Sequence, residues 1–136
     1  MRPISPLPEQ ELLVGNPVVF FEIMAKDAPA LRSFYKNAFD WQFDAPVEGA
    51  KTVDYTIVHP NGESSELQGG IGAAPEGYAG HVTFYVGVPD AESALRKVES
   101  LGGKRMMGPE QVPNGPIIAL FNDPQGYTVG LVQTQD

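Results

Sequence analysis

A carboxylate interrupts an apolar stretch near the start of the chain. Glu22 lies within residues 18–23, a run of β-branched and aromatic side chains that predicts a buried strand. A carboxylate in such a place can serve as a general base that takes a proton from a bound substrate. It can equally have a structural role, tied to backbone amides or to an arginine. Both interpretations make Glu22 the first residue to locate in the fold.

Two other residues able to transfer protons occur together in a later apolar run, residues 81–88. His81 could be a solvated residue at a strand end, an acid–base partner of Glu22 or a contact to a ligand. Tyr85 could donate its hydroxyl to a ligand, or fill the sheet with its hydroxyl on a neighbouring side chain. Glu22, His81 and Tyr85 are therefore the candidate catalytic residues, for an isomerase, epimerase or lyase reaction.

The composition narrows the function classes. The 136 residues include no cysteine, which excludes disulfides and thiolate chemistry and fits the cytoplasm. A net charge of -8 repels phosphate backbones, so we expect no nucleic-acid partner and favour a neutral or cationic small molecule as ligand. No apolar run approaches the roughly 20 residues of a membrane span. Neither a nucleophile elbow nor a phosphate-binding loop motif is present.

The sequence predicts the same order of elements twice. Asp27 is placed to cap a helix that follows the strand of residues 18–23. Asp90 has the same place after the strand of residues 81–88. The remaining strands are predicted near residues 42–43, 52–58, 66–73, 105–107, 116–121 and 127–132.

A self-alignment supports a duplication, because the matches fall at structural landmarks. Phe21, Asp27 and Ala28 match Phe84, Asp90 and Ala91, and Pro60 and Gly62 match Pro124 and Gly126. We therefore expect an α+β fold of two βαβββ modules, which form a cupped mixed or antiparallel sheet with the helices outside. The modules span residues 16–74 and 81–136. Residues 75–80 are a linker, and residues 1–15 are an N-terminal tail that could reach over a neighbouring subunit.

Alternation along each strand sorts the side chains between the helix side and the cup side of the sheet. Phe20 and Glu22 are expected in the cup, with Phe21 against the first helix. In the strand of residues 52–58, the helix side is assigned Val53, Tyr55 and Ile57. In residues 81–88, the second helix is expected to cover Val82, Phe84, Val86 and Val88. The predicted ligand-binding residues in the cup are Phe20, Asp54, Thr56, Thr83, Thr128 and Gly130.

Three segments resemble the vicinal-oxygen-chelate superfamily of glyoxalases, bleomycin-resistance proteins and extradiol dioxygenases. They are residues 16–23 with Phe34-Tyr35 and Phe39-Asp40-Trp41, Gly102-Gly103-Lys104, and the turn Asn122-Asp123-Pro124-Gln125-Gly126-Tyr127. With the repeat, the resemblance spans residues 16–133. It implies two modules whose sheets form a cupped cleft for a small molecule.

The resemblance also implies where a metal would bind, and the chain departs from the pattern there. Metal-dependent members carry His or Gln midway along the first strand of each module, and Glu on the last strand. The matching positions here are Phe20, Thr83 and Gly130, and only Glu66 in the first module keeps a carboxylate. Because a metal needs three or four converging N or O ligands, we expect no metal of the family type and no cofactor.

The sequence therefore predicts a protein that sequesters a small organic molecule in the cleft between its modules. The alternative is a metal-independent isomerase, epimerase or lyase that uses Glu22 with His81 or Tyr85. A metal-dependent glyoxalase or extradiol dioxygenase is the third reading, which the ligand positions disfavour. We also expect a homodimer, because half-domains of this size leave sheet edges to be covered.

Overall fold

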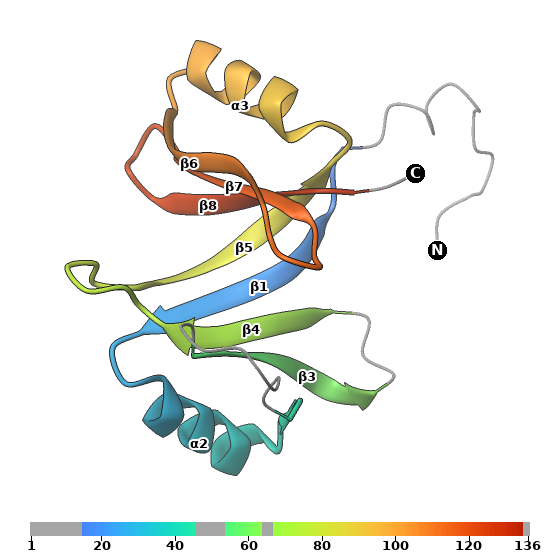
Figure 1. The fold of residues 1–136 in the computed structure, drawn as a ribbon, viewed down its shortest axis with the longest axis vertical. Helices are drawn as coiled ribbons and strands as arrows, with labels where there is room; N and C mark the ends of the chain where they lie inside the picture. The colour runs from blue at the N-terminus through green and yellow to red at the C-terminus, as the bar shows by residue number, and fades with distance from the viewer. Residues whose placement is uncertain (1–14, 46–53, 64–66, 135–136) are drawn as a thin grey trace, which may run out of the picture.

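The computed structural model describes residues 15–45, 54–63 and 67–134. Elements follow one another in the same order in the two halves of the chain (Figure 1). The first half contains β1 (Val18–Ala25), α2 (Ala28–Phe39), β2 (Gln42–Phe43), β3 (Tyr55–Glu63) and β4 (Gln68–Ala73). The second half contains β5 (His81–Val88), α3 (Ala91–Ser100), β6 (Lys104–Gln111), β7 (Ile117–Asn122) and β8 (Thr128–Gln133).

All described strands join one sheet of eight strands, in the order β2-β3-β4-β1-β5-β8-β7-β6. The pairs β1–β4 and β5–β8 are parallel, and the other pairs are antiparallel. The antiparallel pair β1–β5 joins the two halves, and the helices lie outside at opposite ends (Figure 1). The predicted fold of two βαβββ units with a cupped mixed sheet is confirmed.

Both helices begin with the same side-chain cap. A carboxylate oxygen of Asp27 accepts a hydrogen bond from the Ala30 amide at 3.1 Å, and Asp90 accepts one from the Ser93 amide at 3.1 Å. Each cap satisfies an amide that has no partner in the first helical turn. Neither α2, with 12 residues, nor α3, with 10, is long enough to cross a membrane, and these are the only helices in the described ranges.

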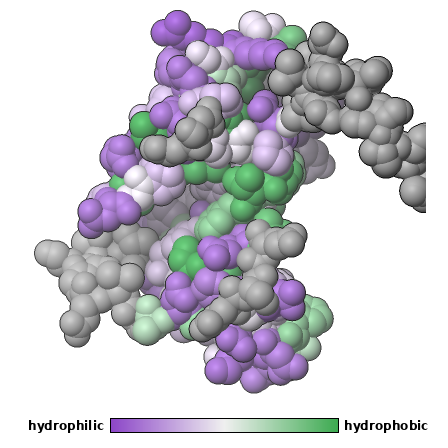
Figure 2. All heavy atoms as spheres, turned by 90° about the vertical axis from the view of Figure 1, so that its right-hand side faces the viewer, coloured by the Kyte–Doolittle hydropathy of each residue, from purple (hydrophilic) through white to green (hydrophobic). Residues whose placement is uncertain are grey.

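Each half has its own hydrophobic core between its helix and its part of the sheet. In the first half, Ile23, Val58 and Ile71 are buried, with Phe21 and Leu31 packed against them. In the second half, the buried residues are Val88, Leu95, Ala119 and Leu131. Side chains at alternate positions of the central strands therefore point away from these cores, into the cup. In space-filling view, hydrophilic side chains gather mostly at the two ends of the molecule and hydrophobic ones across its middle (Figure 2).

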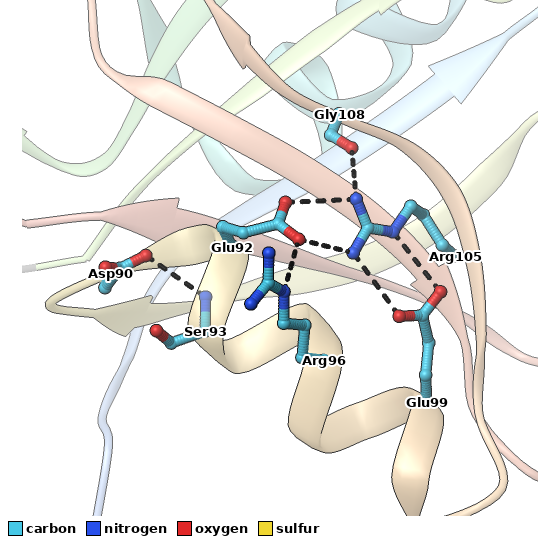
Figure 3. A network of polar contacts seen from close by, with 7 residues as sticks. All are labelled: Asp90, Glu92, Ser93, Arg96, Glu99, Arg105 and Gly108. Carbon is cyan, nitrogen blue, oxygen red and sulfur yellow. Dashed lines mark hydrogen bonds and ion pairs between the residues drawn. The ribbon is translucent and has the colours of Figure 1, made fainter.

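An ion-pair network fastens α3 to the edge strand β6 (Figure 3). The guanidinium of Arg105 pairs with Glu92 at 3.0 Å and with Glu99 at 3.3 Å, and Arg96 also contacts Glu92 at 3.0 Å. Arg105 donates a further hydrogen bond to the Gly108 carbonyl. Exposed pairs of this kind each stabilise a protein only weakly, because solvent screens the charges. Their joint effect here is to fix the outermost strand against the helix.

One packing prediction is wrong in part. Val82 and Phe84 do not pack on the second helix, since they are 77% and 42% exposed. The helix α3 starts beyond the end of β5 and lies against β6, β7 and β8 (Figure 1). On the convex side of the sheet, the side chains from the first half of β5 are therefore left uncovered between the two helices. The far end of the strand joins the second core as expected, with Val88 buried in it and Val86 packed against it.

The opposite directions of two adjacent phenylalanines give a test of this arrangement. Phe21 lies over Gly69, contacts the Trp41 ring and packs against the first core, whereas Phe20 points into the cup and touches Tyr85. Phe21→Ala should lower the free energy of unfolding by about 3 kcal/mol, the low end for a buried phenylalanine because the ring is partly exposed. Phe20→Ala, the matched control, should cost less than half as much. Urea unfolding measures both; equal losses would show that Phe20 belongs to a core.

Candidate functional site

The Glu22 carboxylate is the centre of a hydrogen-bonded cluster on the cup side of the sheet. Tyr55 donates its hydroxyl to Oε1 at 2.7 Å, and Tyr85 donates to Oε2 at 3.0 Å. The His81 Nε2 lies 2.8 Å from Oε2. Glu22 is only 7% exposed and Tyr85 5%. A buried carboxylate is costly unless it is hydrogen-bonded, and these three partners meet that requirement.

The register of the two central strands explains how His81 and Tyr85 reach Glu22. Glu22 of β1 lies directly opposite Thr83 of β5. His81 and Tyr85 are two residues to either side of Thr83, so their side chains share its face and flank Glu22 diagonally. The three candidate catalytic residues named from sequence are thus brought together, within hydrogen-bonding distance of one carboxylate.

Tyr55 reaches the cluster from β3 by crossing β4. The strand between them has glycine at the two positions under the tyrosine ring, Gly70 and Gly72. A Cβ atom at either position would collide with the Tyr55 side chain. The glycines of β4, which weaken a strand by themselves, therefore provide the space that lets the Tyr55 hydroxyl reach Glu22.

The second tyrosine has the same arrangement in the other half. Gly130 of β8 is paired with Tyr85 of β5, and a Cβ at this glycine would meet the Tyr85 ring. The Phe20 ring stands edge-on to Tyr85, with ring centres 5.9 Å apart and an interplanar angle of 82°. Tyr85 is thereby held between the backbone of β8 and Phe20, with its hydroxyl directed to Glu22.

A fourth side chain extends the cluster toward the connection between the halves. The Tyr78 hydroxyl lies 2.6 Å from Nδ1 of His81, whose side chain is 7% exposed. One set of protons satisfies every contact: His81 donates from Nε2 to Glu22 and accepts at Nδ1 from Tyr78. Of the three interpretations of His81 made from the sequence, the solvated residue at a strand end is wrong, because His81 begins β5 inside this hydrogen-bonded network.

The tyrosines are held in their neutral form. Burial first, and then the charge of Glu22 and the hydrogen bond to it, raise the pKa of Tyr55 and of Tyr85 far above the usual value of about 10. Both residues therefore act as donors of hydrogen bonds at neutral pH. No lysine or arginine pairs with Glu22 in the part of the chain that the structure describes.

The predicted faces of β3 are reversed. Asp54 forms an ion pair with Arg32 of α2 at 2.9 Å, and Thr56 lines a surface hollow together with Arg32 and Ser33. Both therefore lie on the helix side rather than in the cup. Tyr55, which was assigned to the helix side, is in the cup. The cause is register: Thr56 lies beside the buried Ile71, whose side chain packs in the first core.

The other sequence-predicted ligand residues lie on the cup side, but two have their polar groups engaged. Thr83 is buried and donates its hydroxyl to the Thr128 carbonyl at 2.5 Å. The Thr128 hydroxyl donates to the side-chain oxygen of Asn122 at 3.2 Å. Glu66, Val53 and residues 1–14 of the predicted N-terminal tail lie outside the described residues.

The positions that hold a metal in the family do not fit one here. Phe20 presents a phenyl ring, the Thr83 hydroxyl is used by Thr128, and Gly130 is covered by Tyr85. Among the described residues there is also no group of three or more His, Cys, Asp or Glu side chains suited to a metal.

Sequence reasoning missed two members of the cluster, Tyr55 and Tyr78. For Tyr55 a signal existed: glycines at 70 and 72, on one face of a strand, indicate that a large ring from a neighbouring strand lies there. Tyr78 lies in the predicted linker, where its contact with His81 depends on how the chain enters β5. Nothing in the local sequence indicates that contact.

Comparison with known proteins agrees with this architecture. A "Glyoxylase-like domain-containing protein" from Didymella fabae is 28% identical over 110 residues, which cover 79% of this chain and 85% of that protein. The structure of methylmalonyl-CoA epimerase from Mycobacterium tuberculosis is similar with a TM-score of 0.64 at 13% identity, covering 94% of this chain and 96% of that one. A hypothetical protein from Bacillus halodurans C-125 has a TM-score of 0.64 at 13% identity, covering 90% and 97%.

At such low identities the two solved structures show a shared fold alone. The family is shown by sequence, because the model of the Glyoxalase/Bleomycin resistance protein/Dioxygenase superfamily matches residues 18–131. The chain belongs to the Glyoxalase/Bleomycin resistance protein/Dioxygenase superfamily.

Proposed function

We propose that the protein binds a small organic molecule in the cup, above the cluster around Glu22. The observation that carries this proposal is a buried carboxylate, with three donors, on the concave face of the two central strands. By register, the same face of the sheet carries apolar side chains: Phe20 on β1, Ile57 on β3, and Ile118 and Leu120 on β7. A few convergent polar groups within an apolar surface are the usual makeup of a small-molecule site.

The charge of the protein favours a neutral or cationic ligand. The chain carries a net charge of -8, and within the cup the Glu22 carboxylate has no lysine or arginine partner among the described residues. An anionic ligand would lose solvation and meet repulsion there.

Proton transfer is the second candidate function, and the chain of contacts from Tyr78 through His81 to Glu22 favours it. In this reaction a substrate C–H bond breaks, the proton moves to a Glu22 oxygen, and the electron pair delocalises into an adjacent carbonyl of the substrate. His81 or Tyr85 returns a proton and is reprotonated by Glu22. Glu22, His81 and Tyr85 all lie on the same side of a substrate bound in the cup. The proton is therefore returned to the same face of the substrate from which it was removed. This geometry supports an isomerase that shifts a double bond over an epimerase, which needs a donor on the opposite face.

A homodimer and a cytoplasmic location remain part of this proposal. The exposed side chains of Val82 and Phe84, on the convex side of the sheet, are compatible with a subunit interface.

Binding at the cluster can be tested with a pair of isosteric variants. Native mass spectrometry of protein purified from cells should show a bound organic compound in the wild type. The occupancy should fall at least tenfold in Glu22→Gln, because this substitution removes the negative charge of the carboxylate. Asp54→Asn is the matched control, since its carboxylate lies on the helix side with Arg32. Equal retention in both variants would contradict a role for Glu22 in binding.

Deuterium uptake separates a binder from an enzyme. The compound released from the wild type is incubated with metal-free protein in deuterated water. An isomerase should place deuterium on carbon, and Glu22→Gln should abolish the exchange while leaving the fold intact. Binding with no exchange above the rate in water would exclude proton transfer and leave the sequestering protein.

The protonation state of the cluster predicts a loss of stability in alkali. Tyr55 and Tyr85 have raised pKa values in the folded state, so their stabilising effect is complete below the unfolded value of about 10 and is lost as the pH rises above it. The free energy of unfolding should fall by about 1.4 kcal/mol per pH unit for each of them. Tyr55→Phe with Tyr85→Phe should flatten this slope. Tyrosinate absorbance measures the ionisation; titration of all five tyrosines near pH 10 in folded protein would contradict it.

A further inference from the structure

A surface hollow lies between α2 and the strands β2 and β3, on the opposite side of the sheet from the cup. Its volume is about 310 Å³, which is within the range of small-molecule sites. The helix contributes Arg32, Ser33 and Lys36 to its lining, and β3 contributes Thr56. Two cations and two hydroxyls, all able to donate hydrogen bonds, therefore line one space.

Much of this donor capacity is unused within the described residues. Arg32 donates to a backbone carbonyl of β4 at 3.2 Å and pairs with Asp54 at 2.9 Å, which leaves other N–H groups of the guanidinium free. Lys36 and the hydroxyls of Ser33 and Thr56 form no hydrogen bond or ion pair in the part of the chain that the structure describes. The hollow thus presents donors to an acceptor that these parts of the chain do not supply.

The charges around the hollow leave one cation without compensation. Arg32 and Lys36 are one turn apart on α2, and like charges at this spacing repel one another and destabilise a helix. Asp54 compensates Arg32. The carboxylate of Asp44, which also lines the hollow, lies 2.7 Å from Nε2 of His59. The charge of Lys36 therefore favours a bound anion.

A second hollow of about 520 Å³ adjoins the first, and Lys36 and Phe43 line both. The other residues that line it are Asn37, Asp40, Trp41 and Gln42. The Trp41 ring is stacked on Tyr35, with ring centres 5.0 Å apart and an interplanar angle of 10°, so its position is fixed. A molecule whose charged group lies beside Lys36 can extend over Phe43 toward this aromatic side chain.

We propose that the two hollows together bind a phosphate monoester of a small organic molecule with a flat ring. A phosphate group presents several strong acceptor oxygens and a negative charge, which match the cations and hydroxyls of the first hollow. The phosphate lies in the first hollow because two cations and one carboxylate line it, whereas Lys36 and Asp40 balance one another in the second. The ring lies in the second hollow, against Phe43 and Trp41.

This site is separate from the one around Glu22 and has the opposite charge preference. Tyr55 and Thr56 are neighbours on β3, and their side chains lie on opposite sides of the sheet. The backbone of the strand therefore separates the two sites. An anion excluded from the cup by the Glu22 carboxylate is accepted on the outer side.

The test uses the full chain, with phenyl phosphate as the probe and the fluorescence of Trp41, the single tryptophan of the sequence, as the signal. We expect a saturable change in fluorescence, with an affinity for phenyl phosphate at least fivefold higher than for inorganic phosphate, which has no ring. Phenol, which has no anion, should give no saturable change at the same concentrations.

Two lysine variants locate the site. Lys36→Gln should weaken phenyl phosphate binding at least tenfold, because it removes the cation common to both hollows. Lys97→Gln is the matched control, since it makes the same change in the last turn of α3, away from the hollows, and should leave the affinity unchanged. Thr56→Val, which removes one donor from the first hollow, should weaken binding several-fold.

Three outcomes would overturn the site: no saturable response in folded wild-type protein, equal affinity in the two lysine variants, or phenol binding as tightly as phenyl phosphate. Equal affinity for inorganic phosphate and phenyl phosphate would overturn the place of the ring in the second hollow. Both lysines are exposed, so their variants should fold. The three probes on the wild type decide the question if a variant does not.

Discussion

The burial of the Glu22 carboxylate is the constraint around which the cup is built. Removing an ionised group from water costs several kcal/mol, and that cost must be offset by hydrogen bonds. The donors come from two separated strands, Tyr55 from β3 and both His81 and Tyr85 from β5, and Tyr78 contacts His81 in turn. The two halves of the molecule are consequently fastened to each other at a polar centre, in addition to the backbone pairing of β1 with β5.

Three glycines on the strands β4 and β8 provide the space that this polar centre needs. Gly70 and Gly72 on β4, and Gly130 on β8, leave the sheet without side chains where tyrosine rings lie. Their lack of a Cβ costs local strand stability, since glycine loses more conformational freedom on folding than other residues. The polar cluster therefore depends on residues that contribute no polar atom to it. A methyl group at any of the three positions would displace a ring and withdraw its hydroxyl from Glu22.

The sequence predicted the duplicated order of elements, both aspartate caps and the shared face of Glu22, His81 and Tyr85, because each depends on local periodicity. It assigned the two faces of β3 the wrong way round. Residues on both faces of that strand include apolar side chains, Ile57 on one and Val58 on the other, so alternation alone does not choose between them. The buried state of His81 likewise depends on Glu22, 59 residues earlier in the chain. Such contacts are set by the pairing of distant strands, which no local pattern contains.

The pairing of β1 with β5 has an approximate two-fold symmetry. Phe21 faces its equivalent Phe84, and Glu22 occupies in the first half the place that Tyr85 occupies in the second. The hydrogen bond between Glu22 and Tyr85 therefore joins two symmetry-related positions. In an assembly of two identical halves, each residue here would meet its own copy, and two carboxylates would repel one another. An acceptor beside a donor requires two halves of different sequence, and the two modules of this chain meet that requirement at these positions.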